Sequence, residues 1–345
     1  MINVGVIGCG SIARMRHAVE YSNNPNVKIM GFCDFNKDRA VEMANDFGGK
    51  VYASDDEMLN DSSIDAVSVC VANAYHAEIT IKALNHGKHV LCEKPMAITL
   101  KDCADMIEAA NNNGKRLMIG HNQRLAPAHK KAKEILDSGE LGNIISFSTT
   151  FGHKGPEMWS VDKGNNTWFF KKSTAAFGSM ADLGIHKIDL IRYLVGEEVD
   201  NVYANLSTLD KKFSDGTPIE VDDNSVELIK FKNGPLGTVT TSWTHYGDEC
   251  NATVLYCEKG VMHLYSDPNY SLKIDYADGT RAHYKLDRIQ TNNDSMQANS
   301  GVIDTFINGV LNSKKTIIDA EEAIESMKVV FACLESAENG CRVKL

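Results

Sequence analysis

The sequence predicts an α/β domain with a parallel, doubly wound sheet, followed by an α+β domain with a large, mainly antiparallel open sheet. In the first 120 residues, short apolar runs typical of buried strands alternate with segments of helical periodicity. Later in the chain, consecutive strand patterns are flanked by helical segments. We therefore expect a first domain over residues 1–121 and a second over residues 122–345.

A glycine-rich turn gives the first domain its expected function. The first strand, residues 2–7, runs directly into Gly8-Cys9-Gly10-Ser11-Ile12-Ala13, a Gly-x-Gly-x-x-Ala form of the dinucleotide fingerprint. The first glycine allows the tight turn, and the second lets the backbone approach a pyrophosphate. The alanine lets the next helix pack closely, with its N-terminal N–H groups directed at the phosphates. We expect Gly8, Gly10, Ser11 and Ile12 to bind a dinucleotide.

The residue after the second strand indicates which dinucleotide. Residues 27–33 form this strand, and Asp34 follows about 20 residues beyond the glycine turn, where a carboxylate accepts hydrogen bonds from a ribose diol. Asp34 would repel a 2′-phosphate, and Phe35 supplies no cation. Lys37 and Arg39 lie close enough in sequence to keep NADP open as an alternative. We expect NAD as the cofactor, with NADP less favoured.

The rest of the first domain follows the same alternation. Thr99 and Asp102 predict a capped helix that ends near Gly114, and residues 54–57 predict a capping box at a short helix. The remaining strands are expected at residues 51–52, 66–71, 89–92 and 116–120, and the remaining helices at 36–47 and 75–86.

The second domain is expected to leave one sheet face free. Helices are predicted at residues 127–137, 179–195, 296–311 and 319–338, with strands at 144–151 and in several stretches of 201–285. One face of such an antiparallel sheet is often left over after the helices have packed. We expect this face to bury itself against another copy, in a homodimer or homotetramer.

Composition excludes several classes of partner. The 345 residues carry a formal net charge of −10, which argues against nucleic acid or an anionic membrane as the main partner. No apolar run approaches the ~20 residues of a membrane span. A strand pattern from residue 2 leaves no room for a signal peptide. The nine cysteines never form C-x-x-C, which favours a reducing cytoplasm, and no zinc spacing or other metal set occurs.

Two further motifs carry the expected chemistry. Glu93-Lys94-Pro95 follows the fifth strand, and loops at the carboxyl ends of parallel strands line the ligand crevice. Lys94 could stabilise an alkoxide there, although a solvated surface lysine is an equal alternative. Asp182, His186 and Asp189 fall on one face of a predicted helix, which suits a histidine general base but also an ordinary surface pair.

Together these motifs resemble the Gfo/Idh/MocA oxidoreductases. The resemblance rests on the glycine turn, Asp34, Val71-Ala72-Asn73-Ala74-Tyr75-His76, the Glu-Lys-Pro motif and Asp182-Leu183-Gly184-Ile185-His186. It extends to residues 120–127, 258–260 and 336–343, and so covers essentially the whole chain. Val71-Ala72, where many members have Thr-Pro, and Gly178-Ser179-Met180, where a fuller glycine run is common, depart from the family pattern.

The resemblance implies a Rossmann domain and roles for individual residues. It implies catalytic roles for Lys94, Asp182 and His186, cofactor contacts for Asn73, His76, Glu93 and Lys94, and a substrate contact for Arg124. His153, Trp168 and Tyr246 are further candidates for a sugar pocket. The implied activity is NAD-dependent hydride transfer to or from a secondary alcohol of a sugar, a sugar derivative or an inositol-like cyclic polyol. An NAD-dependent glycosidase that uses transient oxidation and a non-catalytic sugar- or NAD-binding regulator remain alternatives.

Overall fold

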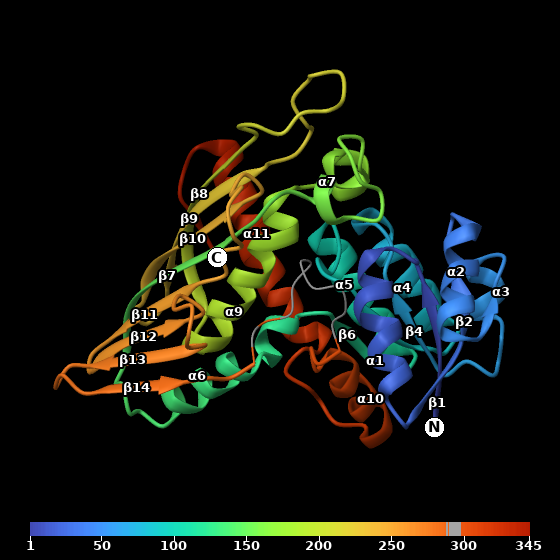
Figure 1. The fold of residues 1–345 in the computed structure, drawn as a ribbon, viewed down its shortest axis with the longest axis horizontal. Coiled ribbons are helices and arrows are strands. Elements are labelled where there is room, and N and C mark those ends of the chain that lie inside the picture. Colours follow the sequence, from blue (N-terminus) through green and yellow to red (C-terminus); the bar gives the residue numbers. More distant parts are fainter. Residues whose placement is uncertain (288, 290–297) are drawn as a thin grey trace.

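The computed structural model describes residues 1–287, 289 and 298–345, which build two sheets side by side (Figure 1). The first is a six-stranded, fully parallel sheet of order β3-β2-β1-β4-β5-β6. Its strands are β1 (Ile2–Ile7), β2 (Val27–Cys33), β3 (Lys50–Val51), β4 (Ala66–Val69), β5 (His89–Cys92) and β6 (Leu117–Ile119). The helices between them are α1 (Ala18–Asn23), α2 (Lys37–Phe47), α3 (Asp55–Leu59), α4 (His76–Asn85) and α5 (Leu100–Asn112).

This arrangement confirms the predicted Rossmann-type sheet. The expected caps form, because Thr99 Oγ1 accepts a hydrogen bond from Asp102 N at 3.0 Å and Ser54 Oγ accepts one from Glu57 N at 3.1 Å. Apolar side chains of α1 and α2 pack on one face of the sheet, and those of α3, α4 and α5 on the other. A π-helical segment, Ala13–His17, joins the glycine turn to α1.

The second sheet has nine strands in the order β14-β13-β12-β11-β7-β10-β9-β8-β15. Within this second sheet, only the β7–β10 pair is parallel among the pairs that the described residues form, so the prediction of a mainly antiparallel sheet is confirmed. The strands are β7 (Ile144–Gly152), β8 (Val199–Ser207), β9 (Asn224–Phe231), β10 (Leu236–Ser242), β11 (Thr253–Cys257), β12 (Gly260–Leu264), β13 (Leu272–Tyr276), β14 (Arg281–Tyr284) and β15 (Val343–Lys344). The helices are α6 (Pro127–Asp137), α7 (Pro156–Trp159), α8 (Lys172–Ala175), α9 (Ile185–Val195), α10 (Val302–Asn312) and α11 (Ala320–Asn339).

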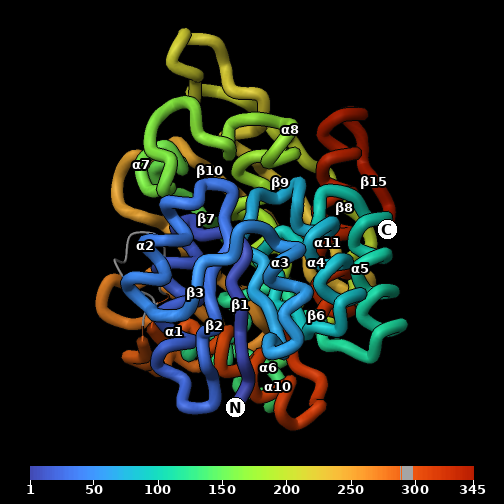
Figure 2. Tube along the Cα trace, turned by 90° about the vertical axis from the view of Figure 1, so that its right-hand side faces the viewer, coloured from blue at the N-terminus to red at the C-terminus, as the bar shows by residue number. Residues whose placement is uncertain are grey.

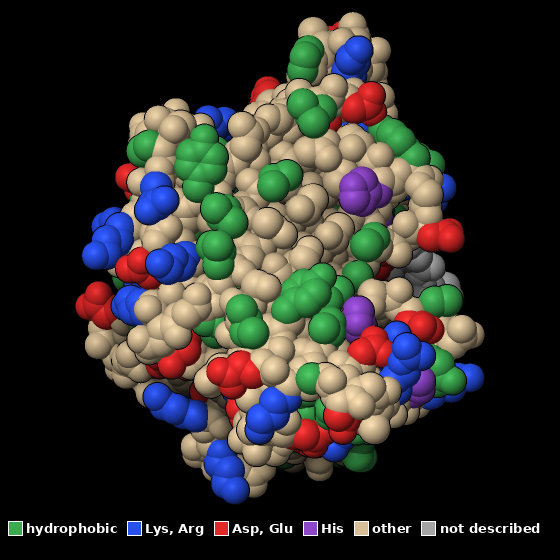
Figure 3. Space-filling view, turned by 90° about the vertical axis from the view of Figure 1, so that its left-hand side faces the viewer, with side chains coloured by type: hydrophobic (Ala, Val, Ile, Leu, Met, Phe, Trp, Pro, Cys, Tyr) green, Lys and Arg blue, Asp and Glu red, His purple; other side chains and the backbone are tan. Residues whose placement is uncertain are grey.

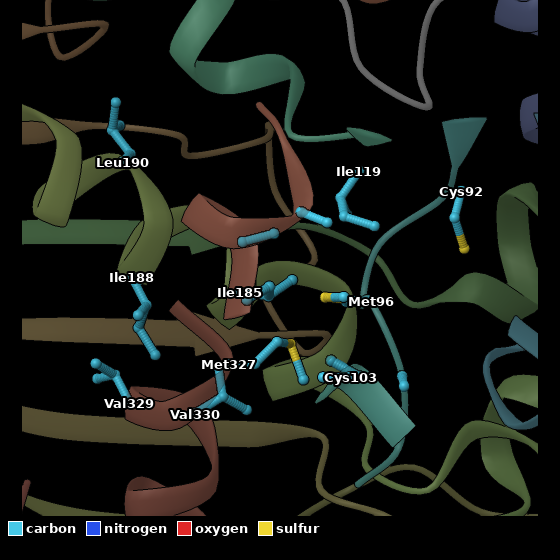
Figure 4. Close-up of a cluster of buried hydrophobic side chains, with 14 of the residues drawn as sticks. Cys92, Met96, Cys103, Ile119, Ile185, Ile188, Leu190, Met327, Val329 and Val330 are labelled. Atoms are coloured by element: carbon cyan, nitrogen blue, oxygen red, sulfur yellow. The ribbon is translucent and has the colours of Figure 1, made fainter. Parts of the chain in front are cut away.

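In the part of the chain that the structure describes, helices cover only the inner face of this second sheet. In Figure 1, α6, α9 and α11 lie on the side of the sheet that faces the first domain. One continuous core joins the two sheets: side chains of β5, β6 and α5 meet those of α9 and α11 (Figure 4). The opposite face of the second sheet is open to solvent and carries scattered apolar side chains (Figure 3).

Helix α10 belongs spatially to the first sheet. Its Val302, Ile303, Phe306 and Ile307 are fully buried in the same core as the side chains of β1 and α1. Figure 2, viewed from the side of the first sheet, shows α10 at the same end of the molecule as the N-terminus. The helix begins at Val302, and residues 296–297 of the predicted helix lie outside the described residues. The domain division at residue 121 stays a prediction.

The sequence also led us to expect unpaired cysteines and no membrane-spanning segment. All nine cysteines are free thiols, and seven of them are buried. Among the described residues, no helix is both long enough and apolar enough to span a membrane.

Candidate active site

A cleft of about 680 Å³ lies where the carboxyl ends of the parallel strands meet the second sheet and its helices. Its volume falls within the roughly 300–1,000 Å³ of small-molecule sites. One part, which we call the nucleotide end, is lined by Gly8, Gly10, Ser11, Ile12, Asp34, Phe35 and Arg39. The other part, which we call the catalytic end, is lined by Lys94, Asn122, Gln123, Asp182, His186 and Asn251.

The glycine turn leaves room for a pyrophosphate. Gly8 adopts a φ of +91°, and a Cβ there would lie 2.5 Å from the carbonyl of Cys70. A Cβ on Gly10 would meet no atom within 4 Å, so open space lies above the turn. The backbone can therefore approach a ligand closely at this point, and the residues present fit a dinucleotide.

Asp34 is held rigidly beside this turn. Its Oδ2 accepts a hydrogen bond from Cys9 N at 2.6 Å, and its Oδ1 accepts one from Asn36 N at 2.7 Å. Each carboxylate oxygen has a second lone pair, so the side chain can still accept hydrogen bonds from a ribose diol. Asp34 thus lies beside the glycine turn and lines the nucleotide end of the cleft, as the sequence predicted.

Asn73, His76 and Glu93 also line the cleft, as expected. Asn73 Nδ2 donates to Ala175 O at 2.9 Å. The two ring nitrogens of His76 lie 2.7 Å from Pro95 O and 3.1 Å from Val71 O, which joins the loops after β4 and β5. Burial lowers the pKa of His76. These contacts shape the wall of the cleft.

Glu93 is anchored by a buried polar chain that the sequence analysis missed. Its Oε1 lies 2.8 Å from His17 Nε2 and 3.5 Å from the Arg16 guanidinium. His17 Nδ1 lies 2.9 Å from Ser68 Oγ, which in turn lies 2.7 Å from the Tyr21 hydroxyl. Burial would raise the pKa of Glu93, but His17 and Arg16 outweigh it and lower the pKa to about 2. Glu93 is thus an anion on the cleft wall.

Lys94 and Asp182 meet across the cleft. Lys94 Nζ donates to Asp182 Oδ1 at 2.9 Å and to the Asp182 carbonyl at 3.0 Å. The fully buried Trp243 donates its indole N–H to Asp182 Oδ2 at 3.1 Å. Burial raises the pKa of Asp182, but the Lys94 charge overcomes this and leaves the pKa below its usual value. Trp243, the residue directly after β10, was not among the sequence candidates.

His186 lies in the same cleft and is nearly buried. It is the second residue of α9, and this helix directly follows the π-helical segment Met180–Gly184 that carries Asp182. Its Nδ1 is buried without a hydrogen-bond partner among the described residues. Burial, followed by the nearby Lys94 charge, holds the pKa of His186 well below 6.5. The imidazole is therefore neutral at pH 7 and can accept a proton.

The expected polar stripe divides in two. Asp182 and His186 face the cleft, whereas Asp189 forms a buried bidentate pair with Arg124 at 2.7 and 2.8 Å and accepts from Ser326 Oγ at 2.8 Å. The Asp182 carboxylate binds Lys94 and Trp243, not the imidazole of His186. The Asp182 carboxylate therefore does not orient the histidine.

Of the four residues expected to contact the substrate, two line the cleft and two do not. His153 and Trp168 line the cleft. The expected substrate contact Arg124 does not line it, because Asp189 and Ile317 O hold the guanidinium inside the second domain. Tyr246 is half exposed, donates its hydroxyl to Asp210, and likewise does not line the cleft. The structure therefore removes Arg124 and Tyr246 from the lining.

Three amide side chains take their place. Gln123 Nε2 donates to Asn251 Oδ1 at 3.3 Å. Asn122 Oδ1, Gln123 Oε1 and Asn251 Nδ2 are buried without a hydrogen-bond partner among the described residues. Such groups cost free energy unless a ligand or water satisfies them. Asn122 and Gln123 lie directly before Arg124 in a motif already singled out, but no sequence signal marked Asn251.

Within the described residues, no group of three or more His, Cys, Asp or Glu side chains is arranged to hold a metal ion.

Comparison with known proteins agrees with this geometry. Residues 2–121 match the Gfo/Idh/MocA oxidoreductase family model with an NAD-binding Rossmann fold, and residues 129–263 match a C-terminal domain model of that family. The chain is 33% identical over 275 residues to levoglucosan dehydrogenase of Pseudarthrobacter phenanthrenivorans, a match that covers 71% of this chain and 68% of that protein. It is 27% identical to myo-inositol 2-dehydrogenase of Thermotoga maritima, over 100% of this chain and 98% of that one. A structure of levoglucosan dehydrogenase with NADH and levoglucosan superposes with a TM-score of 0.86 at 26% identity, over 100% of this chain and 99% of the other.

Proposed function

The chain belongs to the Gfo/Idh/MocA family of oxidoreductases, and on that premise we propose that it is an NAD-dependent dehydrogenase of sugars or cyclic polyols. The reaction is hydride transfer to or from a secondary alcohol, with the corresponding ketone as the oxidised form. The observation that carries the proposal is the meeting of Lys94, Asp182 and His186 at a cleft that also presents the glycine turn and Asp34.

Lys94 holds the reacting oxygen. Its ammonium group has three N–H donors, and Asp182 accepts two of them through Oδ1 and its carbonyl. The third donor is left for the alcohol oxygen, where it stabilises the negative charge that develops as the proton leaves. Asp182, itself fixed by Trp243, keeps the ammonium in this position.

His186 takes the proton. A neutral imidazole next to the hydroxyl accepts its proton during oxidation and returns it during reduction. The low pKa of His186 keeps it in the accepting form at neutral pH. Bound NAD supplies the acceptor for the hydride that leaves the carbinol carbon.

The amide groups favour a substrate rich in hydroxyls. Asn122 and Gln123 offer acceptor oxygens, and Asn251 offers an N–H donor, each without a partner among the described residues. A polyhydroxylated ring carries donors and acceptors in fixed positions, so it can satisfy several such groups at once. The inositol and levoglucosan substrates named for the relatives belong to this class.

A dehydrogenase assay over inositols, hexoses, anhydrosugars and glycosides, with NADH formation as the readout, tests this function. We expect turnover of at least one polyhydroxylated ring. Activity confined to acyclic hydroxy acids or amino acids would contradict the proposal. Release of the aglycone from an aryl glycoside without added NAD would instead identify the glycosidase alternative.

We also propose that the open face of the second sheet joins copies of this chain. Its strands β7 to β11 expose large apolar side chains that a monomer would leave in water. They are Ile145, Tyr203, Val226, Leu228, Leu236 and Tyr256. In light scattering after gel filtration, we expect an oligomer that Leu228→Glu dissociates and that the loop variant Leu209→Glu leaves intact. A monomeric wild type would contradict this.

The nine free thiols support a reducing compartment, and we therefore assign the enzyme to the cytoplasm.

A further inference from the structure

We propose that Asp162, a residue of the second domain, helps to set the choice of cofactor by capturing Arg39 at the nucleotide end of the cleft. This rests on the proposed use of NAD and concerns the 2′-position of its adenosine ribose. Asp34 explains why a ribose diol is accepted there. Asp162 explains why the neighbouring cation, Arg39, is not free to bind a phosphate.

Arg39 lies at the position where a dinucleotide-binding fold would bind a 2′-phosphate. It lies in α2, which begins three residues after Asp34, and it lines the cleft together with Asp34 and Phe35. An arginine at this place in a dinucleotide fold is what accommodates the 2′-phosphate of NADP, because a guanidinium binds phosphate through two parallel hydrogen bonds. From the sequence alone, Lys37 and Arg39 were the two residues that kept NADP open as the cofactor.

In the structure this arginine is already engaged. Its Nη2 donates to Asp162 Oδ1 in a close ion pair, and the Arg39 side chain is 25% exposed. Asp162 lies in the loop after α7 and lines the same cleft. The two residues are 123 positions apart, so the pair ties the second domain to the rim of the nucleotide end.

Neighbouring cations do not replace Arg39. Arg14, on the π-helical segment, is bound by Asp46 and Glu42 and does not line the cleft. Lys37 is exposed at the first turn of α2 and does not line it either. A 2′-phosphate would therefore meet the Asp34 carboxylate and an arginine whose charge Asp162 already balances.

Binding of NADH and NADPH, followed by the fluorescence of their reduced nicotinamide rings, tests the inference without a substrate. In Asp162→Asn the guanidinium is released, and we expect the affinity ratio of NADPH to NADH to rise about fivefold to tenfold, with NADH affinity itself nearly unchanged. Asp34 remains, so the preference shifts without reversing. Asp46→Asn loosens the comparable pair at Arg14 and serves as the matched control, with no change in the ratio.

The double variant Asp162→Asn/Arg39→Gln decides the mechanism. If Asp162 acts through Arg39, the double variant has the same ratio as Arg39→Gln alone. An unchanged ratio in Asp162→Asn would overturn the inference, as would an equal rise in the Arg39→Gln background, because Asp162 would then repel the phosphate directly. Failure of the wild type to bind either cofactor would count against the proposed function instead.

Discussion

The two ends of the cleft differ in how far the protein itself supplies hydrogen-bond partners for their polar groups. At the nucleotide end the polar side chains are already fixed by the protein, as Asp34 is by Cys9 N and Asn36 N, and Arg39 by Asp162. At the catalytic end, Asn122, Gln123, Asn251 and His186 each keep a buried polar atom without a partner among the described residues.

This difference suggests how one fold can keep its dinucleotide cofactor and yet accept different substrates. The nucleotide end is preorganised by backbone geometry, so the ligand adds bonds to groups that are already oriented. At the catalytic end, buried polar groups without partners cost free energy, and we expect hydrogen bonds to substrate hydroxyls to offset this cost. Variants at the two ends should therefore fail in different measured quantities.

The largest effect is expected from His186→Ala. Loss of the proton acceptor should lower kcat by about 10²–10⁴-fold and leave the Kd for NADH within a few-fold. The exposed His86 gives a control, His86→Ala, that should not change kcat. Because burial and Lys94 hold the pKa of His186 well below 6.5, wild-type oxidation should keep its rate as the pH falls through 6.5 and lose it only at a clearly lower pH, where the imidazole becomes protonated. A near-normal kcat in His186→Ala with a verified substrate would make this histidine structural.

The next effect is expected at the opposite end, in Asp34→Ala. Hydrogen bonds to a charged group contribute about 1.5–3 kcal/mol, so NADH should bind about 10–100-fold more weakly. At saturating cofactor, kcat should stay within a few-fold of the wild type, because the chemistry occurs elsewhere. A loss of kcat without weaker cofactor binding would contradict the proposal that Asp34 acts in cofactor binding and not in the chemical step.

Asn251→Ala sharpens the comparison within the catalytic end. Removing the unpartnered Nδ2 takes away one expected hydrogen bond to a substrate hydroxyl, which should raise KM about tenfold with a smaller change in kcat. The substrate analogue that lacks the bound hydroxyl should lose less from this variant than the full substrate does. Equal losses for every substrate would mean that Asn251 only supports Gln123.

The smallest expected effect comes from an unsatisfied group outside the cleft. Glu227, on the inner side of β9, is fully buried with no hydrogen-bond partner for either oxygen among the described residues, and burial raises its pKa to about 8. The folded state then favours the protonated acid, so this residue lowers the free energy of unfolding as pH rises from about 4.5 to about 8. Glu227→Gln should raise Tm by a few degrees at pH 8 and by less at pH 5, with unchanged kcat and KM. An equal Tm difference at both pH values would contradict the ionisation argument.

Sequence patterns predicted what depends on neighbours along the chain. The strand–helix alternation, the helix caps and the glycine turn are local, and they gave the first sheet and the place of Asp34 correctly. The gathering of Lys94, Asp182 and His186 was anticipated through motifs.

The partners of these residues could not be read in the same way. Trp243 reaches Asp182 across 61 positions and Asn251 reaches Gln123 across 128, and neither stands in a local pattern. Arg124 was placed at the substrate because a motif cannot tell which carboxylate an arginine will meet, and here Asp189 meets it inside the domain. Long-range pairing of polar side chains is set by the finished packing.

The return of α10 to the first sheet has a consequence for how this protein is made. Glu20, in α1, accepts hydrogen bonds from Ser300 N at 2.8 Å and Ile303 N at 3.4 Å, and α10 then fills the core above β1. The first 120 residues can form their strands early in synthesis, but their hydrophobic core stays open until some 180 further residues have been translated. During that interval the nascent chain exposes the apolar surface that Phe306 and Ile307 will cover, the kind of surface that chaperones bind.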